Sequence, residues 1–322
     1  MVDPGDVGPK PASYRDGMAT ASDTEHATPA RSPAHDPRRR LLAGIALRER
    51  QLVVAGAPTV VLEGGDGPPV VLLHGGIETG GAYWAPVVPR LVETHRLVVP
   101  DAPGLGASEP MARLDDETVG DWLAALLRLT GDGRPTLVAH SLLGSLAARF
   151  AVRHPELLGR LVIYGAPAID RYRMPPGLVL AAIRFDLRPT LRNHERFERW
   201  AFLDPDRTKR RDPEWFETFG AYCVSQGRVR HVKRAMRQLV KAGTRRIAEN
   251  DLRRIEIPTT LLWGRHDRMA PLRLAESATA ALGWPLHVIE DAGHVPHLEQ
   301  PEAFLEALGG VLDEQRPSDG RR

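Results

Sequence analysis

Short apolar runs and longer stretches of helical spacing alternate along most of this chain. Two β-branched runs at 51–55 and 59–62, separated by Gly-Ala-Pro, predict an N-terminal hairpin. Continuous apolar runs, typical of strands covered on both faces, predict further strands at 70–73, 97–99, 136–139, 161–164, 259–263 and 286–289. Helical spacing predicts helices at 85–93, 116–129, 141–154, 272–282 and 302–312. This alternation predicts an α/β fold with a doubly wound, mostly parallel sheet.

The alternation is interrupted before the strand predicted at 259–263. From 170 to about 251 the pattern predicts no strand, and amphipathic helices are predicted at 178–185, 192–202, 213–225 and 229–241. We therefore divide the chain into a sheet-containing core over 43–166 and 253–315 and an all-helical insertion over 167–252.

The two ends of the chain differ from the rest in composition. The first 42 residues are rich in Pro, Gly, Asp, Ala and Arg, which predicts a disordered tail over 1–42, and a short tail is expected over 316–322. The apolar stretch after Arg38-Arg39-Arg40 is too short for an export signal and lacks a cleavage site. No apolar run approaches the roughly 20 residues that span a bilayer, so we expect a cytoplasmic protein without a membrane partner.

Overall charge and cysteine content exclude several classes of function. The 43 basic and 41 acidic residues nearly balance, so no nucleic-acid partner is predicted. The single cysteine, Cys223, excludes an internal disulfide and a cysteine-rich metal site, and the histidines and carboxylates show no metal-binding spacing. The glycine-rich turn at 101–108 lacks the third glycine of a dinucleotide fingerprint. The sequence therefore predicts neither a metal nor a cofactor.

A strand, a serine and a helix follow one another without a gap at 136–150. A serine in this position is typical of a nucleophile elbow, because the turn lifts the hydroxyl above the sheet and the helix N-terminus favours developing negative charge. The alternative interpretation makes Ser141 an ordinary helix N-cap. The stretch resembles the Gly-x-Ser-x-Gly elbow of the α/β-hydrolase family, with Ala139 and Leu143 in place of the two glycines. Leu143 needs room that such a turn usually lacks, and the neighbouring Gly144 offers some.

The resemblance covers roughly residues 50–315 and extends to two later loops in the order typical of the family. Trp-Gly-Arg-His-Asp267 follows one predicted strand, and Asp-Ala-Gly-His294-Val-Pro follows the last. The resemblance therefore implies a catalytic triad of Ser141, Asp267 and His294. Asp170, which follows the strand predicted at 161–164, is the alternative acid. The helical insertion resembles the family's cap.

Two further sets of residues are expected around this triad. The loop His74-Gly75-Gly76 resembles the family's His-Gly-x, which implies that the amides of Gly76 and Leu142 stabilise an oxyanion, with Ile77 as the alternative donor. We also expect Ile77 and Trp263 to contact the substrate. The cap contains clusters of basic residues, which we interpret first as solvent-exposed faces of its helices. The alternative, functional interpretation is that an arginine of the cap binds an anionic substrate.

These observations predict a serine hydrolase that cleaves a small-molecule ester or a related carbonyl compound through an acyl-enzyme. The triad implied by the resemblance also serves C–C bond hydrolysis of ring-cleavage products, which is the second interpretation. A third is a ligand-binding protein or cyclase on the same fold, suggested by the bulk of Leu143.

Overall fold

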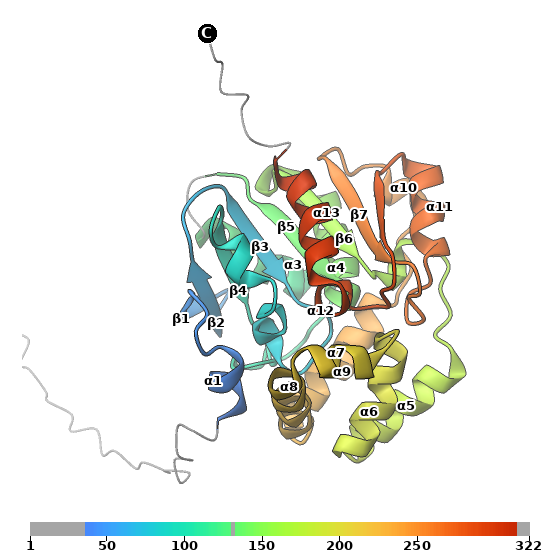
Figure 1. Cartoon of the computed structure of the whole chain (residues 1–322). Coiled ribbons are helices and arrows are strands. Elements are labelled where there is room, and N and C mark those ends of the chain that lie inside the picture. Colours follow the sequence, from blue (N-terminus) through green and yellow to red (C-terminus); the bar gives the residue numbers. More distant parts are fainter. Residues whose placement is uncertain (1–35, 130–132, 314–322) are drawn as a thin grey trace, which may run out of the picture.

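The structure is a computed structural model that describes residues 36–129 and 133–313, and a single sheet runs through its core (Figure 1). Its strands are β1 (Arg48–Val54), β2 (Ala57–Gly64), β3 (Pro69–Leu73), β4 (Arg96–Pro100), β5 (Thr136–His140), β6 (Arg160–Tyr164), β7 (Thr259–Gly264) and β8 (Leu286–Ile289). They are ordered β1-β2-β4-β3-β5-β6-β7-β8. The β1–β2 and β2–β4 pairs are antiparallel, and all the others are parallel. The predicted doubly wound, mostly parallel sheet is confirmed.

Helices of the core cover both faces of the sheet. They are η2 (Gly80–Trp84), α2 (Val88–Leu91), α3 (Asp116–Leu129), α4 (Ser141–Arg153), η3 (Pro155–Leu157), η4 (Pro167–Ile169), α10 (Glu249–Leu252), α11 (Arg273–Leu282), α12 (Pro296–Glu299) and α13 (Pro301–Asp313). Alternate residues of β3 point to opposite faces: Val71 and Leu73 join the apolar cluster of α3 and α4, whereas Val70 and Leu72 join that of α2 and α13. This double burial explains why the central strands read as continuous apolar runs.

One core helix departs from its predicted bounds. A single helix over 85–93 was expected, but the chain forms the short helices η2 and α2 instead. Pro86 and Pro89 lack the amide hydrogen that a continuous helix would need, so they break the element that the apolar spacing suggests.

The helices between η4 and α10 lie together on one side of the sheet (Figure 1), and we call them the cap. They are α5 (Pro176–Leu187), α6 (Leu191–Ala201), α7 (Pro205–Arg211), α8 (Pro213–Gln226) and α9 (Arg230–Gly243). Several of its aromatic residues form an apolar cluster, which includes Phe202, Phe216, Phe219 and Tyr222. The short helix α10, although it follows the cap in sequence, packs against α4 of the core.

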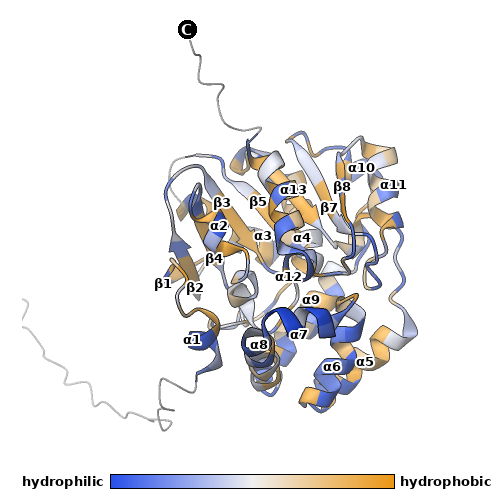
Figure 2. Ribbon diagram, in the orientation of Figure 1, coloured by the Kyte–Doolittle hydropathy of each residue, from blue (hydrophilic) through white to orange (hydrophobic). Residues whose placement is uncertain are grey.

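Helix α7 has no counterpart among the predicted elements. Its sequence, Pro-Asp-Arg-Thr-Lys-Arg-Arg, carries no apolar spacing, and Figure 2 shows it as hydrophilic. The helix begins because Asp204 accepts a hydrogen bond from the Arg207 amide and Pro205 occupies its first position. The Asp-Pro pair was the available signal for this helix.

The N-terminal segment shows a second departure. Part of the tail expected to be disordered, Pro37–Leu41, forms helix α1, which packs against α8 of the cap. Arg38 is buried and forms ion pairs with Asp101 at 2.9 Å and Glu49 at 3.0 Å. Asp101 lies far along the chain, so local composition gave no sign of this partner. The rest of the expected tails, 1–35 and 316–322, lies outside the described residues.

Two structural features bear on membrane and metal partners. None of the helices in the described ranges combines the length and apolar content needed to cross a bilayer. Over the same ranges, no group of three or more His, Cys, Asp and Glu side chains is arranged to hold a metal ion.

Candidate active site

Ser141 lies at the sharp turn where β5 ends and α4 begins. Its φ angle is +53°, in the left-handed region that L residues rarely adopt, and such strain is typical of functional turns. The helix and strand approach most closely at Gly144, where an added Cβ would lie 2.9 Å from the Ala139 carbonyl oxygen. Leu143 is fully buried in the apolar cluster beneath the sheet. The turn therefore accommodates Leu143 because Gly144 provides the close contact.

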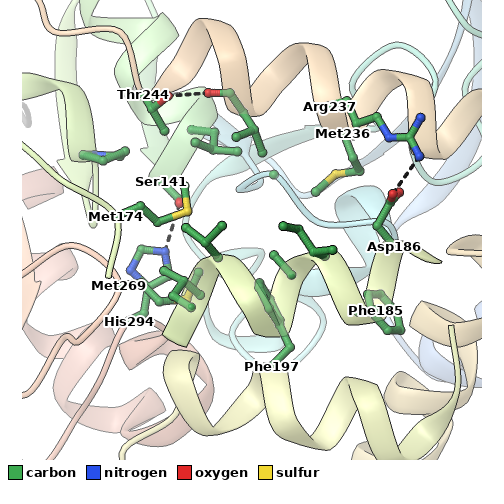
Figure 3. Close-up of a pocket in the computed structure, with 18 of the residues that line it drawn as sticks. Ser141, Met174, Phe185, Asp186, Phe197, Met236, Arg237, Thr244, Met269 and His294 are labelled. Atoms are coloured by element: carbon green, nitrogen blue, oxygen red, sulfur yellow. Dashed lines mark hydrogen bonds and ion pairs between the residues drawn. The ribbon is translucent and has the colours of Figure 1, made fainter. Parts of the chain in front are cut away.

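The structure brings together the three residues of the predicted triad. Ser141 Oγ lies 2.9 Å from His294 Nε2, and His294 Nδ1 lies 2.8 Å from Asp267 Oδ2 (Figure 3 shows the first contact). The other carboxylate oxygen, Oδ1, accepts hydrogen bonds from the Met269 and Ala270 amides, both at 2.8 Å. Asp267 is thus held in one orientation, and its free oxygen faces the imidazole.

Neighbouring parallel strands place the acid and the histidine side by side. Asp267 follows β7, and His294 follows β8 in residues 290–295, which we call the histidine loop. Both loops therefore leave the same edge of the sheet. The loops touch at Gly264, where an added Cβ would lie 1.9 Å from the Gly293 carbonyl oxygen.

We expect Gly264→Ala to lower both stability and activity. The added methyl overlaps the backbone of the histidine loop, so the loop must move, and overpacking of this kind costs about 2 kcal/mol of unfolding free energy. Urea denaturation measures the loss of stability, and the rate at which Ser141 reacts with a fluorophosphonate probe measures the loss of activity. Gly309→Ala on α13 is the matched control, because an added Cβ there meets nothing within 4 Å and alanine favours a helix. Equal stability of the two variants would contradict the prediction.

The histidine loop is also tied to the cap. The His294 amide donates to the Ala201 carbonyl at 2.7 Å. The buried carboxylate of Glu299 accepts from the Gly293 amide and from the Leu203 amide, both at 2.6 Å. The sequence analysis did not identify Glu299, and its only signal was an acidic residue within the Pro-His-Leu-Glu stretch that follows the predicted histidine loop.

His140, beside the nucleophile, is a second residue that the sequence analysis missed. Its Nε2 donates to the His294 carbonyl at 3.0 Å, so its Nδ1 accepts from the Tyr83 hydroxyl at 3.2 Å. Burial lowers the pKa of His140 well below its usual value, so the ring is neutral. His140 therefore holds the His294 backbone in place through the hydrogen bond to its carbonyl.

The residues predicted to stabilise an oxyanion lie beside Ser141. Gly76 and Leu142 both line the cavity described below, and an added Cβ on Gly76 would lie 2.5 Å from Leu142 Cδ1. The Leu142 amide lies in the first turn of α4, where amides have no acceptor within the helix. The Ile77 amide, the alternative donor, already donates to the Gly75 carbonyl at 2.8 Å. His74 links this loop to the chain after β4, because its Nε2 accepts a hydrogen bond from the Ala102 amide.

Other expected site residues lie elsewhere. The expectation that Trp263 contacts the substrate is wrong, because this side chain is fully buried in the core and its indole donates to the Ala270 carbonyl at 2.8 Å. Ile77 packs against the apolar cluster of the cap and is not among the described residues that line the cavity. The carboxyl of Asp170, the alternative acid, lies near Ser277 and two arginines and does not contact His294.

A cavity of about 400 Å³ opens above Ser141 and His294, between helices α5 and α9 of the cap. Its wall is mostly apolar and includes Met174, Leu178, Val179, Ala182, Ile183, Phe185, Phe197, Val232, Met236, Val240 and Met269. In Figure 3, Ser141 and His294 lie toward one end of this cavity, and Asp186 and Arg237 lie toward the other. An apolar group next to the nucleophile would therefore be shielded from water.

Comparison with known proteins identifies the family. A sequence profile of the alpha/beta hydrolase family matches residues 70–307. The chain belongs to this family. It is similar to the pimeloyl-[acyl-carrier protein] methyl ester esterase of Chromobacterium violaceum, with 30% identity over 261 residues, 78% of this chain and 96% of the esterase.

Two further relatives of this alpha/beta hydrolase differ in chemistry. One is the 2-hydroxy-6-oxo-6-(2'-aminophenyl)hexa-2,4-dienoic acid hydrolase of Metapseudomonas resinovorans, 26% identical over 82% of this chain and 90% of that protein. The other is the crystal structure of a bacterial membrane phospholipase A, with a TM-score of 0.69 and 26% identity over 86% of this chain and 88% of that one. The comparisons therefore include a methyl ester esterase, a phospholipase and a hydrolase of a hexadienoic acid.

The basic residues in the cap of this hydrolase mostly bind groups of the protein itself. Arg207 and Arg211 donate to backbone carbonyls of the histidine loop and of α12. Arg237 lines the cavity and forms an ion pair with Asp186 at 2.6 Å, and Lys233 donates to the Asp186 carbonyl. The arginine in the cavity wall thus already has an anionic partner.

Proposed function

We propose that this alpha/beta hydrolase cleaves carboxylic esters that carry an apolar group, through an acyl-enzyme formed on Ser141. The observation that supports the proposal most directly is the 2.9 Å contact between Ser141 Oγ and His294 Nε2 at the base of an apolar cavity. A serine hydroxyl needs an adjacent base to become a nucleophile, and His294 lies at the distance such a base requires.

The geometry supports the following sequence of proton transfers. Ser141 Oγ attacks the ester carbonyl while His294 Nε2 takes its proton, and the amides of Gly76 and Leu142 stabilise the resulting oxyanion. The C–O bond then breaks, and His294 returns the proton to the leaving alcohol. Water, deprotonated by His294, then attacks the acyl-enzyme. The bond between the acyl carbon and Ser141 Oγ breaks, His294 returns the proton to Oγ, and the acid is released. Asp267 keeps the proton of the neutral imidazole on Nδ1, so that Nε2 is free to act as the base.

Labelling with a fluorescent fluorophosphonate tests this proposal, because the probe reacts only with an activated serine. We expect stable labelling of the native enzyme, its loss in Ser141→Ala and in His294→Ala, and full labelling of Ser277→Ala, which removes an exposed serine. A folded native enzyme that resists the probe would contradict the proposal and favour ligand binding without hydrolysis.

The substrate class is tested with chromogenic esters of increasing acyl length. The apolar wall of the cavity predicts that kcat/KM rises from acetyl to medium-chain acyl groups, since each buried methylene contributes about 0.8 kcal/mol. C–C bond hydrolysis is the second candidate, favoured by the similarity to the Metapseudomonas resinovorans hydrolase. Turnover of a vinylogous diketone without turnover of any ester would favour this second candidate.

A further inference from the structure

Glu78 lies on the wall of the same cavity, and the mechanism proposed above does not use it. It belongs to the loop after β3, two residues beyond Gly76. Burial and the nearby charge of Asp186 raise the pKa of Glu78 to about 7, and the Glu78 charge contributes to the raised pKa of the Cys223 thiol. Asp186 is on α5 and Cys223 on α8, so the Glu78 carboxyl reaches from the core toward the cap.

The described part of the chain places no cation against this carboxyl. The Glu78 carbonyl accepts a hydrogen bond from the Gly106 amide, but among residues 36–129 and 133–313 the Glu78 carboxyl has no hydrogen-bond donor other than its own amide and no ion-pair partner. Arg237 lines the same cavity, but its guanidinium forms an ion pair with Asp186. Lys233 also lines the cavity, and its ammonium donates to the Asp186 carbonyl.

A carboxyl without a partner is costly in a mostly apolar wall, and a ligand that supplies a donor would remove that cost. We propose that Glu78 determines specificity by binding a hydrogen-bond donor, above all an ammonium group, on an otherwise apolar ester substrate. The proposal rests on the proposed function. It assigns the enzyme to amino- and hydroxy-substituted esters, in contrast to the anionic substrate that the basic cap had suggested.

A panel of p-nitrophenyl esters with acyl chains of equal length tests this proposal. The chains end in a methyl, hydroxyl, ammonium or carboxylate group. In the native enzyme we expect the ammonium ester to exceed the methyl ester in kcat/KM by about tenfold, and the carboxylate ester to be the poorest substrate. Glu78→Gln should abolish the preference for ammonium and keep that for hydroxyl, and Glu78→Leu should abolish both.

Glu306→Gln, an exposed carboxylate on α13, is the control and should leave every ratio unchanged. Preference of the native enzyme for the carboxylate ester would overturn the proposal. The proposal would also fail if both Glu78 variants kept the native ratio of kcat/KM for the ammonium ester to kcat/KM for the methyl ester. If no ester is hydrolysed, the proposed function fails. The role of Glu78 is then tested by calorimetric measurement of the binding of an n-alkylamine and of the n-alkanol of equal chain length. Amine binding that Glu78→Leu weakens about tenfold supports the role, and binding that the variant leaves unchanged refutes it.

Discussion

Replacing Asp267 by asparagine is expected to lower kcat for ester hydrolysis about ten-thousand-fold while the fold is retained. Oδ1 of Asp267 accepts two backbone amides, so the amide oxygen of an asparagine must take that place. Its NH2 group then faces His294 Nδ1 and donates to it. The imidazole must carry its proton on Nε2, and it can no longer accept the proton of Ser141.

Steady-state kinetics with a chromogenic ester measure this effect, and circular dichroism verifies the fold. Asp170→Asn is the matched control, because Asp170 was the alternative acid in the sequence and does not contact His294. Its activity should stay within a few-fold of the native value. A large loss in Asp170→Asn together with an active Asp267→Asn would reverse the assignment of the acid.

Replacing Arg38 by methionine is expected to lower the free energy of unfolding by about 3 kcal/mol. The Asp101 side chain is fully buried, and Arg38 is its cationic partner at 2.9 Å. Burial raises the pKa of Asp101, whereas Arg38 and the amides of Ala107 and Gly81 oppose that rise. Without Arg38 a buried carboxylate loses its counter-charge, and the two amides recover only part of the cost.

Urea denaturation followed by tryptophan fluorescence measures this loss. Arg40→Met, two residues away on the same helix, is the control, because the Arg40–Glu214 ion pair is exposed and such pairs contribute less than about 1 kcal/mol. Equal stability of the two variants would show that α1 is not an integral part of the fold.

The parts of the structure that were predictable from sequence depend on local patterns. The central strands were identified because both faces are buried, and the helix at 116–129 because its apolar spacing is regular. Short motifs in a family-specific order predicted the candidate triad, and the structure places its three residues within hydrogen-bonding distance of one another. Features that rely on the spacing of neighbours in the chain are therefore accessible without coordinates.

The features that were missed depend on partners far along the chain. The ion pair between Arg38 and Asp101 attaches helix α1 to the core, and Glu299 accepts a hydrogen bond from the Leu203 amide of the cap. Trp263 was expected to contact the substrate because it ends a strand, but the direction of its side chain places the indole in the core. No single motif encodes the direction in which a side chain points or its contacts with residues distant in the chain.

The hydrogen bonds between the histidine loop and residues 201–204 have a consequence for protein engineering. The last residue of α6 and the link to α7 belong to the cap by sequence, yet they hold the backbone of His294 through Ala201 and that of Gly293 through Glu299. Arg268 adds a contact to the Phe202 carbonyl at 2.6 Å. A chimaera that receives a foreign cap should therefore retain its own residues 201–204, and recombination points belong on either side of them.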